Sequence, residues 1–149
     1  MANEHDITIP ITCVCEDGII PRYAHSGDAG LDLHSAEEVT LQPFERALIS
    51  TGIALAIPSG YAGYVLPRSG LAIKQGLSIV NAPGLIDSGY RGEVKVIAIN
   101  LDPTIAIKIK KGERIAQLVV SPCAHVQLLK VDTLDETQRN QSGFGSSGI

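Results

Sequence analysis

Polar side chains and glycines gather in a few short segments of this sequence, and one of these segments could bind phosphate. The segment Pro67-Arg68-Ser69-Gly70 opens a stretch, residues 69–75, that we expect to form a short helix. Backbone N–H groups at a helix N-terminus attract anions, and an arginine guanidinium matches the geometry of phosphate oxygens. A plain helix cap, with the serine bonding to the next turn, would need the same residue types. By itself the segment favours the plain cap.

A second segment, residues 81–92, lies between two strand-like stretches and is expected to form a long hairpin. It carries Leu85 and Ile86, then Asp87, and then Tyr90 three residues later. This order sets a carboxylate beside an aromatic wall, which suits a pocket for a planar ring or a sugar. Exposed backbone groups of such a hairpin could also pair with the edge of a base, as a neighbouring strand would. A surface loop without a ligand is the alternative.

Two further segments carry polar residues whose role the sequence alone leaves open. Residues 28–33 have the pattern of a glycine turn that enters a strand, with Asp28 and Asp32 facing water. In the segment 112–118, Gln117 interrupts an apolar stretch. A buried glutamine side chain needs a hydrogen-bond partner, so this residue calls for an explanation.

Short strands are the elements that must position these segments. The sequence contains eighteen isoleucines and ten valines against one methionine and no tryptophan, a composition that favours strands. Alternating or continuous apolar stretches are separated by turn residues and occupy residues 7–11, 47–57, 61–66, 77–80, 94–98, 105–109, 115–120 and 126–131. Many short strands at this spacing predict an all-β sandwich or barrel with one short helix. The absence of an alternating βαβ pattern argues against a Rossmann-type sheet.

Length, charge and hydropathy exclude several classes of protein. A chain of 149 residues corresponds to about one domain. It can bury enough surface to fold without disulfide bonds or a structural metal. The net charge of −4 argues against a nucleic-acid partner bound through a basic surface. No apolar run approaches the ~20 residues of a membrane span, and the N-terminus lacks the features of a signal peptide. We therefore expect a cytoplasmic protein with neither a membrane nor a nucleic-acid partner.

The cysteines and histidines give no sign of a metal site. The three cysteines form no C-x-x-C pair, and we expect reduced, buried thiols. Three histidines have no spacing typical of metal ligands: His25, His34 and His125. We interpret them as residues that are on the surface or whose hydrogen bonds are satisfied within the protein.

The composition changes after Val131, where the apolar alternation stops. We expect a β domain over residues 1–131 and a flexible C-terminal arm over residues 132–149. Fully extended, the arm could span ~60 Å at ~3.3 Å per residue. The arm contains an arginine and a lone phenylalanine among glycines, Arg139 and Phe144. Such residues are unusual in a terminus whose only role is to keep the protein soluble.

Taken together, the segments resemble the five ordered motifs of the homotrimeric dUTP pyrophosphatases, the dUTPases. The corresponding segments follow the order and spacing of the family: residues 28–35, 67–76, 84–96, 112–119 and 139–148. The resemblance covers nearly the whole chain. It implies a jelly-roll β-fold, a homotrimer and Mg²⁺-dependent hydrolysis of dUTP to dUMP and pyrophosphate. Such a reaction keeps uracil out of DNA and supplies dUMP for thymidylate synthesis.

The resemblance implies roles for residues around the base and the sugar. Asp87 would orient and activate the water that attacks the α-phosphorus in line. Tyr90 would pack against the deoxyribose and leave no room for a 2′-hydroxyl, which would exclude UTP. The uracil edge would be read by Asn81 and by the backbone of three hairpin residues: Gly84, Leu85 and Ile86.

The resemblance also implies phosphate and metal contacts. Phosphate oxygens would be held by three residues of the second motif: Arg68, Ser69 and Gly70. Gln117 would hold a phosphate or a metal-bound water, and Lys95 lies near the phosphates in some relatives. Asp32 matches the family carboxylate that contacts Mg²⁺ through water, so a direct protein ligand is not expected. Arg114 is interpreted as bracing its motif through an internal ion pair.

In the family, the C-terminal arm closes over the nucleotide and each site is built from three chains. Here Arg139 would contact the γ-phosphate, Phe144 would stack on uracil, and Gly145 and Ser146 would donate to phosphate. The arm is long enough to reach a neighbouring subunit, and its closure would exclude water once substrate is bound. Two glycines that usually precede the aromatic residue are replaced in this sequence: Asn140 and Ser142.

Three alternatives stay open. A dCTP deaminase, or an enzyme that deaminates dCTP and then cleaves dUTP, shares the fold, but such relatives activate water with a glutamate. This hairpin instead carries Asp87 and Tyr90 in the pyrophosphatase pattern. A non-catalytic nucleotide-sensing trimer could lose Asp87 or Arg139, and this chain keeps both. An adhesion module of the same fold class would leave four polar residues unexplained: Arg68, Asp87, Gln117 and Arg139.

Overall fold

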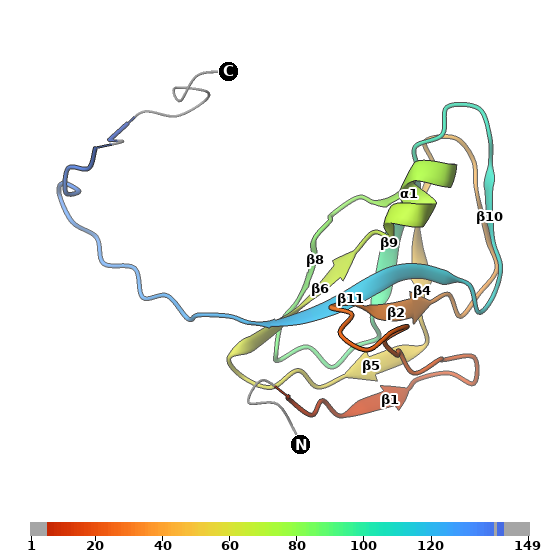
Figure 1. Ribbon diagram of the computed structural model, residues 1–149, viewed down its shortest axis with the longest axis horizontal. Coiled ribbons are helices and arrows are strands. Elements are labelled where there is room, and N and C mark those ends of the chain that lie inside the picture. The colour runs from red at the N-terminus through yellow and green to blue at the C-terminus, as the bar shows by residue number, and fades with distance from the viewer. Residues whose placement is uncertain (1–5, 139, 142–149) are drawn as a thin grey trace.

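Antiparallel strands make up most of the chain, as the apolar alternation predicts. The computed structural model describes residues 6–138 and 140–141, which Figure 1 traces in colour. In this part of the chain the elements are β1 (Ile11–Cys13), β2 (Leu31–His34), β3 (Val39–Leu41), β4 (Arg46–Ser50), β5 (Ile53–Leu55), β6 (Tyr61–Leu66), α1 (Ser69–Gln75), β7 (Leu77–Ile79), β8 (Gly84–Ile86), β9 (Lys95–Asn100), β10 (Ile107–Ile109) and β11 (Arg114–Pro122). The prediction of an all-β fold with one short helix is confirmed.

The strands form two larger sheets and two short ribbons. The four-stranded sheet has the order β2-β11-β6-β8, and the three-stranded sheet has the order β4-β9-β7. β1 pairs with β5 and β10 pairs with β3, again antiparallel. Figure 1 shows β11 crossing the body beside β2 and β6, with α1 at one end of the strands.

Alternate side chains of these strands pack into a common core. On β9, Val96, Ala98 and Asn100 are buried, whereas Lys95 is exposed on the outer face. Complete burial of one aliphatic side chain stabilises a fold by about 1.5–3 kcal/mol. Residues of both sheets share the core, among them Leu33, Leu41, Ile49, Ile53, Ile57, Val96 and Leu118. The core therefore fixes the segments at the strand ends, where the polar residues lie.

The apolar stretch over residues 126–131 differs from the prediction of a strand. β11 ends at Pro122, and the N–H of Cys123 donates to the carbonyl of Gly60 (2.8 Å) just beyond it. From there the chain runs away from the body without forming a described strand (Figure 1), and Leu128 is 94% exposed. An apolar pattern shows that a segment could form a strand, but a strand also needs a partner within reach.

Several local expectations can be compared with the structure residue by residue. Gly76 ends α1 with a φ of 71°, and its N–H donates to the carbonyl of Ala72 (3.0 Å), as predicted. Ile105 is exposed and lies before β10 begins, in a loop where the Asp102 carboxylate accepts its N–H (2.7 Å). The three cysteines are free but exposed, so the expected burial of their thiols is wrong. No helix among the described residues is long and apolar enough to span a membrane.

Candidate active site

The predicted site residues that the structure describes line two separate clefts. The first, which we call the hairpin cleft, has a volume of about 290 Å³ and is lined by seven of them: Asn81, Gly84, Leu85, Ile86, Asp87, Tyr90 and Lys95. The second, which we call the arginine cleft, has a volume of about 420 Å³ and is lined by the other five: Asp32, Arg68, Ser69, Gly70 and Gln117. The two clefts have no lining residue in common.

One wall of the hairpin cleft is the edge strand β8. Its pairing with β6 places Gly84 opposite Val65 and Ile86 opposite Gly63. In the described structure β8 is the last strand of its sheet. The main-chain N–H and C=O groups along its outer edge are therefore available to a ligand, as they would be to another strand.

A tight turn places Asp87 and Tyr90 directly after β8. The Tyr90 N–H donates to the carbonyl of Asp87 (3.1 Å). The Arg91 guanidinium donates to the carbonyls of Ser88 (2.7 Å) and Tyr90 (2.8 Å), which holds the turn from outside. The carboxylate and the phenol ring both line the cleft and stay exposed there.

The ring of Tyr90 contacts two residues that follow it closely in the chain, Gly92 and Glu93. Its hydroxyl donates to the carbonyl of Glu93 (2.9 Å). The ring also lies against Gly92, where an added Cβ would stand only 2.6 Å from Tyr90 Cζ and 2.9 Å from Cε2. Because this is closer than carbon atoms can pack, the ring position requires a glycine at residue 92.

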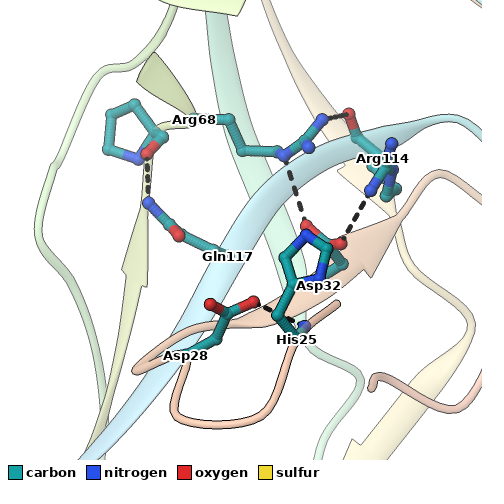
Figure 2. A network of polar contacts seen from close by, with 7 residues as sticks. His25, Asp28, Asp32, Arg68, Arg114 and Gln117 are labelled. Atoms are coloured by element: carbon teal, nitrogen blue, oxygen red, sulfur yellow. Dashed lines mark hydrogen bonds and ion pairs between the residues drawn. The ribbon is translucent and has the colours of Figure 1, made fainter. Parts of the chain in front are cut away.

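In the arginine cleft, one carboxylate joins two arginines, as Figure 2 shows. The carboxylate of Asp32 on β2 lies 3.3 Å from Arg68 Nε and 3.1 Å from Arg114 Nη1. Arg68 Nη1 also donates to the carbonyl of Arg114 (3.1 Å). The Asp32 side chain is only 16% exposed, so solvent screens these contacts less than it screens an ordinary surface pair. The internal ion pair expected for Arg114 is present.

Gln117 has the partner that its place in an apolar stretch requires. Its side-chain amide donates to the carbonyl of Pro67 (2.9 Å), a bond that Figure 2 marks with a dashed line from Gln117. The register between β11 and β2 shifts between Arg114 and Ala116, an irregularity of the kind that re-aims nearby side chains. Gly30 leaves room for the amide, because a Cβ there would lie 2.7 Å from Gln117 Oε1.

The interpretation of residues 67–70 as a plain helix cap is not supported. The N-cap residue of α1 is Arg68, and no side chain makes a capping hydrogen bond at this end of the described helix. Ser69 and Gly70 are exposed and line the arginine cleft instead.

Other titratable groups surround the arginine cleft. The Asp28 carboxylate accepts the backbone N–H of His25 (2.8 Å). Burial lowers the pKa of His34, an effect that Asp32 opposes and the two arginines reinforce, so the imidazole is neutral at neutral pH. Its Nδ1 is buried without a hydrogen-bond partner among the described residues, so the expectation of an exposed or satisfied histidine is not met here.

Comparison with known proteins gives consistent matches. The dUTPase family model matches residues 16–148. A deoxyuridine 5′-triphosphate nucleotidohydrolase of Thermobifida fusca is 54% identical over 129 residues, which cover 87% of this chain and 72% of that protein. The enzyme of the same name from Cutibacterium acnes is 51% identical over 144 residues, covering 97% and 93%. A mutant dUTPase of Staphylococcus bacteriophage 80alpha, solved with dUpNHpp, has a TM-score of 0.89 at 33% identity and covers 95% of this chain and 99% of that one.

These matches extend over both clefts and over nearly all of the β-fold, so the predicted dUTPase-like jelly-roll architecture is confirmed. The chain belongs to the dUTPase family, and the predicted dUTP diphosphatase activity is confirmed.

Some predicted contacts cannot be placed, and one polar residue of the hairpin cleft was not predicted. Four predicted arm contacts lie outside the described residues: Arg139, Phe144, Gly145 and Ser146. Sequence reasoning did not single out Glu93, which lines the hairpin cleft beside Lys95. Glu93 directly precedes the apolar stretch over residues 94–98, two positions before Lys95, and this was the available signal.

Replacement of Gly92 by alanine tests the packing of the Tyr90 ring. The added methyl group must displace the exposed ring from its place against residue 92, so we expect Gly92→Ala to weaken dUMP binding severalfold. Titration calorimetry with dUMP measures the effect. Gly89→Ala is the matched control, because a Cβ there meets nothing within 4 Å. Wild-type affinity in Gly92→Ala would contradict the fixed ring position.

Proposed function

We propose that this chain hydrolyses dUTP to dUMP and pyrophosphate with Mg²⁺, as a homotrimer in the cytoplasm. The observation that carries the proposal is how the predicted residues divide between the clefts. The hairpin cleft holds those expected around the base, the sugar and the attacking water, and the arginine cleft holds those expected around the phosphates. A nucleoside triphosphate has the same two ends, a ring and sugar at one and a row of negative charges at the other.

The hairpin cleft suits a deoxyuridine. The outer edge of β8 offers main-chain donors and acceptors to the uracil edge, over residues Gly84, Leu85 and Ile86, and Asn81 adds a side-chain amide. The Tyr90 ring forms the wall against which the deoxyribose packs. The hydrogen bond from its hydroxyl to the main chain holds the ring in this place, where it leaves no room for a 2′-hydroxyl.

Asp87 activates the attacking water in this proposal. Its carboxylate is exposed in the cleft at the end of β8, where a water molecule can reach it. As the water oxygen bonds to the α-phosphorus, its proton passes to the carboxylate and the bond from that phosphorus to the bridging oxygen breaks. The electrons of that bond leave with the pyrophosphate.

The arginine cleft binds the phosphates. Arg68, Ser69 and Gly70 contact phosphate oxygens, and the guanidinium offers paired N–H groups for this purpose. Asp32 and the carbonyl of Arg114 hold Arg68 before any ligand arrives, so little side-chain freedom is lost on binding.

The residues of the arginine cleft fit a hydrated magnesium ion. Asp28 and Asp32 lie there beside Gln117, and no cluster of three His, Cys, Asp or Glu side chains exists within the described residues. This donor set suits Mg²⁺, which keeps most of its waters and takes further oxygens from phosphates. Asp32 would hold the ion through a water, using a free lone pair of an oxygen that already faces an arginine. When bound, the ion offsets negative charge on the triphosphate.

A trimer would complete the site. Neither cleft alone has the residues for a whole nucleotide, and residues 124–138 run away from the body with Val126, Leu128 and Leu129 exposed (Figure 1). Apolar side chains in an extended segment need a surface that covers them. In a closed trimer the arm of one copy would lie on a neighbour and bring Arg139 to the neighbour's site.

The position of Glu93 bears on the deaminase alternative, because a deaminase needs a glutamate near the base. Glu93 does line the hairpin cleft, but its carboxylate faces Ser50, Gly52 and Lys95, which occupy both of its oxygens. This geometry favours pyrophosphate release over deamination.

Exchange of the Asp87 carboxylate for an amide tests the proposed reaction. Asp87→Asn keeps the shape of the cleft but cannot take a proton, so we expect dUTP binding within about threefold of wild type and a loss of turnover of about 10²–10⁴-fold. Product analysis with Mg²⁺ and separate dUTP, dCTP, dTTP and UTP measures both the reaction and its specificity. An active Asp87→Asn, or a uracil nucleotide formed from dCTP, would contradict the proposal.

Removal of the residues after Gln138 tests the role of the arm. We expect this truncation to leave the trimer intact and to lower turnover about 100-fold, because misplaced or missing substrate contacts cost that much without changing the reacting groups. Light scattering gives the assembly and steady-state assays give the rate. A chain that ends at Ser146, which keeps all predicted arm contacts, is the control. Full activity without residues 139–149 would show that the arm has no part in the reaction.

A further inference from the structure

A carboxylate that the proposed reaction does not use lies in the wall of the hairpin cleft. Glu93 Oε1 accepts the hydroxyl of Ser50 and the N–H of Gly52 (2.9 Å), and Oε2 lies 3.4 Å from Lys95 Nζ. The Glu93 side chain is only 20% exposed. Burial would raise the pKa of Glu93, but the hydrogen bonds from Ser50, Gly52 and Lys95 together lower it, so the carboxylate is charged at neutral pH.

The two oxygens of Glu93 have different partners in the fold. Oε1 is anchored to the scaffold, because Ser50 ends β4 and Gly52 directly precedes β5. With Oε1 fixed, Oε2 is directed at Lys95. Ser50 and Lys95 are also opposite each other in the pairing of β4 with β9, so the carboxylate lies beside a defined cross-strand pair.

Lys95 supplies the positive charge of the hairpin cleft. Among the described residues that line this cleft it is the only lysine or arginine, whereas Asp87 and Glu93 bring negative charge. Its side chain is 42% exposed, and an ammonium on a flexible four-carbon stem samples many positions unless a partner holds it. Glu93 keeps the ammonium at the wall of the cleft.

The main chain of Glu93 acts on the other wall of the same cleft. Its carbonyl accepts the hydroxyl of Tyr90 (2.9 Å). The residue thus orients an aromatic ring through its backbone and a cation through its side chain.

We propose that Glu93 is a positioning residue for nucleotide binding, whose carboxylate holds the Lys95 ammonium where it contacts the phosphate next to the deoxyribose. That phosphate brings more negative charge to a cleft that already contains two carboxylates, and Lys95 is placed to offset it. The inference rests on the proposed function, since it takes the sugar end of the nucleotide to lie in the hairpin cleft.

Glu93→Gln separates the anchoring of the side chain from its effect on Lys95. The Gly52 N–H needs an acceptor, so the amide oxygen must take the place of Oε1, and the amide NH₂ then faces the ammonium. The anchor is kept while Lys95 loses its acceptor. We expect the inhibition constant of dUMP to rise about fivefold and that of deoxyuridine, which has no phosphate, to stay unchanged. The KM for dUTP should rise while kcat changes by less than about twofold.

Lys95→Met completes a double-mutant cycle. It should weaken dUMP by a similar factor, and Glu93→Gln should then have no further effect in the Lys95→Met background, because both changes remove the same contact. Asp17→Asn is the matched control: Asp17 pairs with Lys111 (2.9 Å) outside both clefts, and its loss should change none of these constants.

Three results would overturn the assignment. These are unchanged dUMP inhibition in Glu93→Gln, unchanged dUMP inhibition in Lys95→Met, and additive effects of the two changes. A purely structural role would also weaken deoxyuridine and lower the melting temperature in both backgrounds. If the wild-type chain failed to hydrolyse dUTP, the proposed function would fail, but calorimetry with dUMP and deoxyuridine would still test the role of Glu93.

Discussion

Both clefts depend on β6, because this strand pairs with a different strand on each side. Its pairing with β8 sets the wall of the hairpin cleft, and its pairing with β11 places Gln117 opposite Leu66, directly before the residues that open α1. Gly63 of β6 lies so close to the core that a Cβ there would stand 2.7 Å from Ile57 Cδ1. A slip of one residue would turn every side chain of the strand to the other face, so the register of β6 positions both sets of residues at once.

Charge is paired in both clefts before a nucleotide binds. In the arginine cleft, Asp32 is shared by Arg68 and Arg114, which holds both guanidinium groups in place. In the hairpin cleft, Lys95 is held by Glu93 while the Asp87 carboxylate stays exposed. Holding long side chains in place in advance reduces the entropy lost on binding. In our proposals, the same physical device serves phosphate binding in one cleft and sugar-phosphate binding in the other.

The sequence predicted the segments that line the clefts because each carries its chemistry in residues that are close in the chain. The helix after Arg68 and the hairpin that carries Asp87 are of this kind. The division into two clefts could not be predicted in this way, because it follows from the register of β6 with both neighbours. The strand predicted over residues 126–131 is not formed, since apolar alternation does not show where a partner strand lies. Glu93 was missed because its anchoring partners, Ser50 and Gly52, lie 43 and 41 residues away in the sequence.

Because the two clefts share no lining residue, we propose that a complete site in the trimer joins the hairpin cleft of one copy to the arginine cleft of another. Mixed trimers of two inactive variants test this most directly. Asp87→Asn chains keep an intact arginine cleft, and Arg68→Gln chains keep an intact hairpin cleft. When equal amounts are unfolded together and reassembled, about a quarter of the sites should combine two intact clefts and restore that fraction of the wild-type dUTP turnover. If each site were contained within one chain, every site would keep a defect. The mixture would then be as inactive as either variant alone, which would contradict a site shared between subunits.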